Sequence, residues 1–112
     1  FKRILRYEAS PIPMFSPTNV ALGKKRALLV GDAASLANPF TGEGIFSSLK
    51  SGKSASEAII EHFNDPLKVL KAYKRKIKDL LTELNEAYSF YVQYQSLNHA
   101  QRQDMLKTIL TI

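Results

Sequence analysis

The residue types best suited to chemistry gather in one segment, where a short apolar run ends in Gly31 and Asp32. A carboxylate just beyond the end of a strand can accept hydrogen bonds from the hydroxyl groups of a ligand. Ala33 is small, so a ligand can approach the backbone at this point. For the Gly-Asp pair alone, an ordinary solvent-exposed aspartate is the simpler interpretation. The ordered string of residues that follows favours a ligand site.

The second part of this segment predicts a helix N-terminus that faces the ligand. Turn-forming and helix-opening residues follow one another: Pro39, Thr41, Gly42, Glu43, Gly44 and Ile45. The first N–H groups of a helix have no partner inside the helix, and the helix end carries about half a positive charge. The glycines let a ligand come close, so an anionic ligand atom is stabilised there. A carboxylate such as Glu43 is favourable at any helix start, so no catalytic residue is assigned.

Two elements must position these residues. The apolar run Ala27–Val30, ended by a glycine, predicts a strand buried on both faces. A helix is expected to start between Thr41 and Ile45 and to continue to about Phe63. Its apolar or small positions recur at helical spacing: Ile45, Leu49, Gly52, Ala55 or Ser56, Ile59 and Phe63. Many serines keep this helix thin, so it can lie close against a sheet or a ligand.

The rest of the chain is predicted to be mostly helical. A short strand is expected over residues 1–8, and the three prolines of residues 9–19 predict a loop. Asp65 and Pro66 predict the N-cap and first residue of a helix that runs to about Gln95. A last helix is expected over roughly residues 100–111.

The composition bounds the classes of function. A length of 112 residues suits one small domain, and the absence of cysteine excludes a disulfide framework and thiolate chemistry in this chain. The two histidines have no ligand spacing, so no metal site is predicted. A net charge of +6 fits nucleic acid, an anionic membrane surface, a phosphate-bearing ligand or simply a basic solvated surface. No apolar run is long enough for a membrane span.

The string GDAASLANPFTGEGIFSSLKSGKSASEAI resembles the second FAD-binding motif of flavoproteins with a glutathione-reductase-type nucleotide fold. The resemblance implies that Asp32 binds the flavin ribityl chain, with Gly31 and Ala33 beside it. It implies that the turn and helix start lie against the pyrophosphate and the flavin ring, at Pro39, Thr41, Gly42, Glu43, Gly44 and Ile45. Within this group, NPFTGEGI followed by Leu49-Lys50-Ser51-Gly52-Lys53 is similar to geranylgeranyl reductases. Ser47-Ser48 depart from that family's usual pattern, which puts the substrate in doubt more than the cofactor.

This resemblance implies a mainly α fragment with one or two short strands, the C-terminal part of an α/β FAD-binding flavoprotein. Residues 1–63 would complete the FAD-binding domain, with the flavin motif over residues 27–56, and residues 64–112 would form a helical C-terminal tail. The Gly-x-Gly-x-x-Gly phosphate fingerprint is not in this sequence. In the family it lies upstream in a longer chain.

The implied enzyme is an oxidoreductase that reduces C=C bonds of a geranylgeranyl or other prenyl chain, using reduced FAD. The isolated fragment is expected to be inactive. The implied partners are the remainder of the FAD-binding domain, a prenyl-lipid substrate, an NAD(P)H or ferredoxin-like donor and, for the fragment, a second copy of itself. Nucleic acid is not expected. The expected location is cytoplasmic, with a peripheral place at the membrane left open.

Two alternatives stay open from the sequence. Within the flavin class, the enzyme is an FAD-dependent monooxygenase or a dehydrogenase of another substrate. Outside it, the chain is a basic helical binding module. The aromatic stretch Tyr88–Tyr94 is predicted to be core or a helix seam, with the lining of a prenyl-chain tunnel as the alternative.

Overall fold

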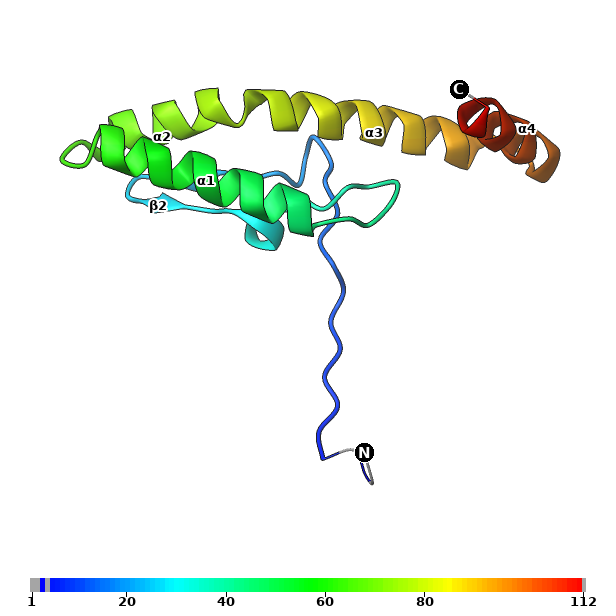
Figure 1. The fold of residues 1–112 in the computed structure, drawn as a ribbon, viewed down its shortest axis with the longest axis horizontal. Helices are drawn as coiled ribbons and strands as arrows, with labels where there is room; N and C mark the ends of the chain where they lie inside the picture. The colour runs from blue at the N-terminus through cyan, green and yellow to red at the C-terminus, as the bar shows by residue number, and fades with distance from the viewer. Residues whose placement is uncertain (1–2, 4, 112) are drawn as a thin grey trace.

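The computed structural model describes residues 3 and 5–111, and in them a short antiparallel hairpin is followed by a mainly helical chain. Figure 1 shows α1 lying beside α2, with α3 continuing in the direction of α2 and α4 turning across its end. The elements run in the order β1 Gly23–Lys24, β2 Ala27–Leu28, the 3-10 helix η1 Gly31–Ala34, α1 Ile45–Glu61, α2 Pro66–Lys76, α3 Lys78–Ser96 and α4 His99–Leu110.

The strand predicted over Ala27–Val30 is shorter and more exposed than expected. Only Ala27 and Leu28 are in a strand, and they pair antiparallel with Lys24 and Gly23. Val30 is exposed, so the prediction of a strand buried on both faces is wrong. A strand is buried on both faces only when other layers cover it, and the described residues supply no further strand on its outer side.

Helix boundaries are closer to the sequence expectations. α1 begins at Ile45, as predicted, and ends at Glu61, close to the expected end. Asp65 caps α2 by accepting a hydrogen bond from the Lys68 backbone N–H at 3.2 Å, and Pro66 is the first helical residue. α4 starts in a capping box, in which Asn98 and Gln101 exchange hydrogen bonds.

Two other expectations are corrected. The helix predicted from Pro66 to Gln95 is interrupted at Ile77, which has φ −90° and ψ 0° and is fully buried. No glycine or proline marks this position, so the sequence gives no sign of the break. Residues 1, 2 and 4 of the strand predicted over residues 1–8 lie outside the described residues. The described remainder is not in a strand, and Figure 1 shows it leading away from the body without a neighbouring strand.

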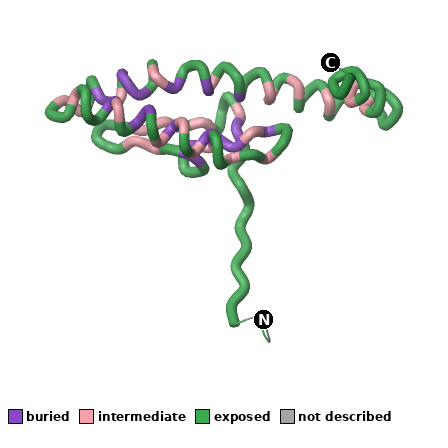
Figure 2. The backbone as a smooth tube through the Cα atoms, viewed as in Figure 1, coloured by how far each residue is buried: buried purple, intermediate pink, exposed green. Residues whose placement is uncertain are grey.

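The core lies where α1, α2, η1 and the start of α3 meet, and Figure 2 shows the buried positions concentrated there. Its largest fully buried side chains include Tyr73, Leu36, Ile77 and Leu80. α1 contributes only small side chains to this core, among them Ala55 and Ala58. Small residues let two helices approach closely, which explains why the serine- and alanine-rich side of α1 faces α2.

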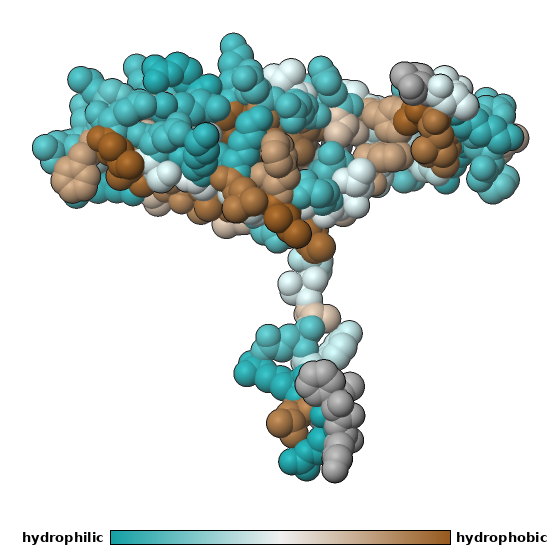
Figure 3. Space-filling model, viewed as in Figure 1, coloured by the Kyte–Doolittle hydropathy of each residue, from teal (hydrophilic) through white to brown (hydrophobic). Residues whose placement is uncertain are grey.

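The apolar residues of α1 lie on its opposite side, which faces away from this core. Ile45 and Ile60 are each 78% exposed and Leu49 is 70% exposed. We call Ile45, Phe46, Leu49 and Ile60 the outer face of α1. Figure 3 shows hydrophobic side chains along this exposed edge of the body. The helical spacing therefore identified a real apolar stripe at Ile45 and Leu49, which does not pack against this core, whereas Ala55 of the same prediction lies in the core.

Candidate functional site

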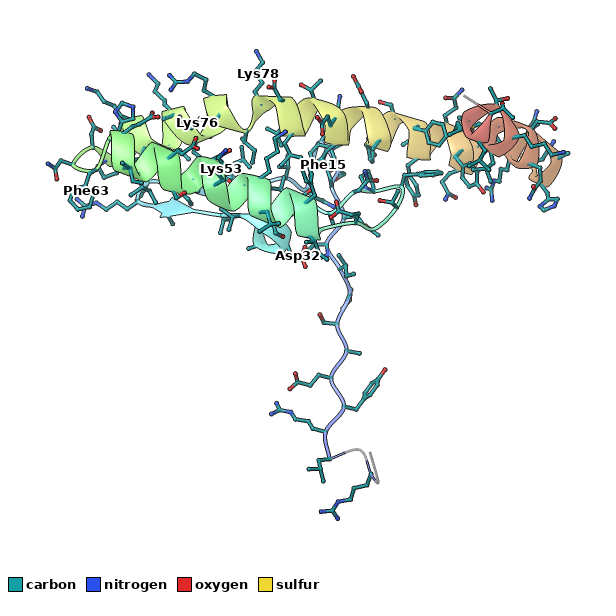
Figure 4. The ribbon with its side chains drawn as sticks, in the orientation of Figure 1. Phe15, Asp32, Lys53, Phe63, Lys76 and Lys78 are labelled. Carbon is teal, nitrogen blue, oxygen red and sulfur yellow. The ribbon has the colours of Figure 1, made fainter. Side chains whose placement is uncertain are left out.

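Asp32 stands beside an open hollow at the N-terminal end of α1. Figure 4 places its side chain next to this helix end, away from Phe63 at the other end. The hollow has a volume of about 540 Å³. It is lined by residues from the N-terminal segment, η1, the Gly-rich turn and α1: Ile12, Asp32, Gly42, Glu43, Gly44, Ile45, Ser48 and Leu49. The carboxylate is exposed, so it is free to accept hydrogen bonds from a ligand.

The backbone that carries Asp32 is fixed from α1. Gly31 has a φ of +56°, which favours glycine, and its N–H donates to Ser51 Oγ at 2.9 Å. A Cβ on Gly31 would lie 2.6 Å from Ser48 Oγ. The Ser51 hydroxyl in turn donates to the Ser48 carbonyl oxygen at 3.2 Å. The small serines of α1 are therefore required where the Gly-Asp turn touches the helix.

A second anchor comes from α2. The Tyr73 hydroxyl donates to the Leu29 carbonyl oxygen at 2.7 Å, just before the Gly-Asp turn. Tyr73 has no exposed surface, and its burial raises the pKa of its hydroxyl to about 12. The hydroxyl therefore stays protonated, and able to donate, throughout the physiological range. Through this bond α2 positions the turn without itself lining the hollow.

The Gly-rich turn is closed by its own hydrogen bonds. Asn38 Oδ1 accepts from the backbone N–H groups of Phe40 at 2.9 Å and of Thr41 at 3.0 Å. The Gly42 N–H donates to the Asn38 carbonyl oxygen at 2.8 Å, and Gly42 has a φ of +77°. An asparagine side chain that bonds the backbone ahead of it is typical of such turns. This geometry brings the chain to the start of α1.

One helix N–H that we expected to be unpartnered is taken. Glu43 Oε1 accepts from the Phe46 backbone N–H at 2.6 Å, so this carboxylate caps the first turn of α1. The role that the structure gives to Glu43 is this cap. No acid–base partner contacts its side chain among the described hydrogen bonds. The N–H groups of Gly44 and Ile45 take part in no hydrogen bond within the described part of the chain.

The aromatic stretch of α3 contributes to the same turn. The ring of Phe40 packs edge-on against Phe90, with centroids 4.7 Å apart, and against Tyr94 at 5.5 Å. Edge-to-face aromatic pairs add stability beyond the burial of their area. α3 therefore holds the tip of the Gly-rich turn. The contact joins a helix to a loop, so it is neither the core nor the helix seam that was predicted for these aromatic residues.

The residues of the hollow fit one wall of a flavin nucleotide site. Gly44 leaves open the space beside the carboxylate, because a Cβ there would lie 3.3 Å from Asp32 Oδ1. At Gly42 a Cβ would meet only the end of the Met14 side chain, at 3.6 Å. A polar ligand can thus reach a carboxylate acceptor and backbone donors from the same side. Carboxylate oxygens and helix N–H groups are the partners that ribityl hydroxyls and an electron-rich ring edge require.

The structure brings together five of the nine residues predicted to bind the cofactor. These five residues line the hollow: Asp32, Gly42, Glu43, Gly44 and Ile45. The other four do not line it: Gly31 packs behind it on Ser48, Ala33 is exposed, Pro39 is buried, and the Thr41 hydroxyl accepts from the Glu43 N–H at 3.2 Å. Binding by any of the nine stays a prediction.

Five residues of the site were not among the predicted cofactor-binding residues. Ile12, Ser48 and Leu49 line the hollow, while Ser51 and Tyr73 anchor the Gly-Asp turn. The two serines were detectable in principle, because their spacing of three places them on one side of a helix. Nothing local marks Tyr73, whose partner lies 44 residues away in the sequence.

Comparisons with known proteins find relatives for about half of this chain. It is 45% identical over 60 residues to the chloroplastic geranylgeranyl diphosphate reductase of Arabidopsis thaliana, which is 53% of this chain and 12% of that protein. The corresponding protein of Nicotiana tabacum is 46% identical over 59 residues. An uncharacterised protein of Methanocaldococcus jannaschii is 36% identical over 56 residues, 14% of its length.

No family model matches the chain. No solved structure matches it either. None of the helices in the described part of the chain is long and apolar enough to cross a membrane. A segment covering about half of this chain is therefore related to the geranylgeranyl diphosphate reductases, and it spans 12% of the length of the plant relatives.

Proposed function

We propose that this chain is the C-terminal part of an FAD-dependent oxidoreductase that reduces C=C bonds of a geranylgeranyl or related prenyl chain. The observation that carries the proposal is the hollow beside Asp32 and Gly44 at the start of α1. It is supported by the relation of about half of this chain to geranylgeranyl diphosphate reductases. When bound, the reduced flavin supplies the hydride, and the protein positions the cofactor and the substrate.

Each residue of the wall has a proposed task. Asp32 accepts hydrogen bonds from the ribityl hydroxyls, and the N–H groups of Gly44 and Ile45 face the polar edge of the flavin ring. Gly42 and Gly44 keep the approach free of side chains. Glu43 keeps the helix start ordered through its bond to Phe46. The apolar residues Ile45 and Leu49 line the same hollow and keep water from one side of it.

The outer face of α1 is the proposed surface to which the remainder of the FAD-binding domain binds. A helix in water buries its large apolar residues and exposes its serines. α1 does the reverse within this chain, with Ser47, Ser51 and Ser54 buried and the outer face in solvent. Exposed apolar residues in a contiguous group mark an interaction surface. The missing phosphate fingerprint would lie in the part that docks here.

The remaining partners follow from the chemistry. A prenyl substrate with a long apolar chain partitions into a bilayer, so we place the enzyme peripherally at a membrane. A nicotinamide nucleotide or a ferredoxin-like protein would re-reduce the flavin. The cytoplasmic location stays a prediction, and the plant relatives are chloroplastic by name.

The proposal is tested in the protein encoded by the complete natural reading frame. Asp32→Ala should lower its FAD content, because one or two lost hydrogen bonds cost about 1–3 kcal/mol, roughly 5- to 150-fold in affinity. Asp104→Ala is the matched control, since it removes an exposed aspartate on α4 far along the chain from the hollow. Flavin absorbance of the purified proteins is measured during serial dilution.

Two results would contradict the proposed role of Asp32 or the proposed class of enzyme. If the Asp32→Ala protein keeps full flavin absorbance on dilution, Asp32 is not a flavin ligand. If the complete reading frame encodes no Gly-x-Gly-x-x-Gly strand-turn-helix upstream of residue 1, the parent is not an FAD enzyme of this class.

A further inference from the structure

We propose that the end of the molecule where α1 turns into α2 docks onto a bilayer that contains anionic lipids. We call this end the α1–α2 tip. It consists of the apolar residues Ile59, Phe63 and Leu67 and the cations Lys25, Arg26, Lys68 and Lys71. The inference deepens the peripheral placement proposed above and does not depend on flavin binding. Figure 4 shows Phe63 at this end, opposite Asp32 along α1.

The tip exposes large apolar side chains at a turn. Phe63, in the link between the two helices, is 78% exposed, and Leu67, in the first turn of α2, is 71% exposed. Neither belongs to the hydrophobic core or to the packed neighbours of that core. Side chains of this kind at a protruding turn can enter the boundary between lipid headgroups and acyl chains without unfolding the protein.

Cations flank the apolar residues on both sides. On one side an open hollow of about 400 Å³ is lined by Lys25 and Arg26 from the hairpin turn together with Ile59 and Phe63. On the other side a shallow hollow of about 440 Å³ is lined by two leucines, three lysines and one aspartate: Leu67, Leu70, Lys68, Lys71, Lys74 and Asp65. The four cations of the tip are exposed. Each hollow thus combines apolar surface with a net positive charge, from two cations in the first hollow and from three lysines against one aspartate in the second.

The carboxylates near the tip are already engaged. Glu61 binds Lys76 Nζ at 2.6 Å, and this hydrogen bond lowers the pKa of the Glu61 carboxyl. Asp65 accepts the Lys68 backbone N–H as the cap of α2. The sequence of α2 contains no acidic residue. Within the described part of the chain, no ion pair involves Lys25, Arg26, Lys68 or Lys71.

This arrangement matches the layers of an anionic bilayer surface. Negative headgroups attract cations at the surface, and apolar side chains are buried just below them. The outer face of α1 differs in position, because Ile45 and Leu49 adjoin the proposed flavin wall. Its neighbouring cation, Lys50, lies over the Phe46 ring with Nζ 5.4 Å from the centroid. The four cations that form no ion pair, together with the distance from the flavin wall, therefore assign the bilayer to the tip and leave the outer face to protein.

The experiment measures co-sedimentation of the 112-residue chain with vesicles. One set is pure phosphatidylcholine, and the other contains about 30% phosphatidylglycerol. Phe63→Ser with Leu67→Ser removes the apolar part of the tip, and Lys25→Gln with Arg26→Gln removes two of its charges. Ile109→Ser with Leu110→Ser is the matched control, because it removes exposed apolar residues from α4, away from both the tip and the proposed flavin wall. Circular dichroism checks that each variant keeps its helices.

The wild type and the control should bind the anionic vesicles, and both tip variants should bind about tenfold or more weakly. The inference is overturned if the wild type ignores anionic vesicles or binds neutral ones equally. It is also overturned if the control loses as much binding as the tip variants, since the tip then has no special role. Flavin content after Asp32→Ala is measured without lipid, so the two proposals fail independently.

Discussion

The two sides of α1 differ in a way that explains much of this molecule. The inner side carries Ser47, Ser51, Ala55 and Ala58, and all four are buried. The Ser51 hydroxyl on this side is satisfied, because it accepts from the Gly31 N–H and donates to the Ser48 carbonyl oxygen. The outer face carries larger apolar residues and contacts little of the chain. The stability of this chain therefore comes from the small side, and the apolar side remains available for a partner.

Packing against the chain's own core and presenting apolar residues to a partner are therefore tasks of two different sides of α1. Small residues bring α1 close to the Gly-Asp turn, so that Ser51 can hold Gly31. Large residues on the outer face cannot add to the core, because the chain supplies nothing to cover them. A helix that buries small residues on one side and exposes large apolar residues on another fits an element of a larger protein, in which a partner covers the exposed side.

The same substitution on the two sides should have very different costs. Leu80→Ala removes a core side chain that is 2% exposed, and we expect it to lower the free energy of unfolding by about 2–5 kcal/mol. Leu49→Ala removes a side chain from the outer face and should change it by less than about 0.5 kcal/mol. Urea denaturation followed by circular dichroism gives both values. Equal costs for the two variants would show that the outer face is packed in the isolated chain.

Two glycines offer a second contrast. Gly31→Ala should destabilise the chain by about 1–2 kcal/mol or more, because its φ of +56° disfavours a side chain and Ser48 stands in the way. At Gly52 a Cβ meets nothing within 4 Å, so Gly52→Ala should stabilise α1 by about 0.5–1 kcal/mol.

The same denaturation curves test both variants. A stabilising Gly31→Ala would mean that the Gly-Asp turn is not held as described. In the full-length protein, Gly52→Ala should raise the free energy of unfolding less, or should lower it, if another element packs closely on this side of α1. The same increase in the free energy of unfolding as in the isolated chain would argue against such packing.

The anchor from α2 predicts a dependence on alkaline pH. The pKa of Tyr73 is raised from 10 to about 12 in the folded chain, so the unfolded chain loses this proton first. Stability from this group is complete below pH 10 and falls as the pH rises from 10 to 12. Tyr73→Phe should remove that part of the decline, at the cost of about 1 kcal/mol at neutral pH for the lost hydrogen bond.

Melting temperatures of both proteins between pH 8 and 12 provide the measurement. The lysines that titrate in the same range are common to both proteins, so the variant serves as their control. Parallel curves for the two proteins would contradict the assigned role of Tyr73.

Local signals in the sequence predicted the start of α1, the cap of α2 at Asp65 and the place of the Gly-rich turn. These features depend on residues within a few positions of one another, such as Asp65 and Pro66. The predictions were wrong about the burial of Val30 and missed the break at Ile77. Burial depends on what covers a segment, and helical spacing shows which residues share a side but not where that side packs. The contact between Tyr73 and Leu29 joins distant segments, so no local pattern could reveal it.

If this chain holds one wall of the proposed flavin site and an outer face that needs the rest of a larger protein, it should bind FAD weakly by itself and associate with itself. Titrating the purified 112 residues with FAD, while following flavin fluorescence and sizing the protein by light scattering, tests both expectations most directly. Tight dinucleotide binding needs contacts to both halves of the ligand, and each ~1.4 kcal/mol lost weakens affinity tenfold. We predict no submicromolar binding, with self-association that Ile45→Ser and Leu49→Ser together reduce. Submicromolar FAD binding by a monomer of this chain would contradict the account.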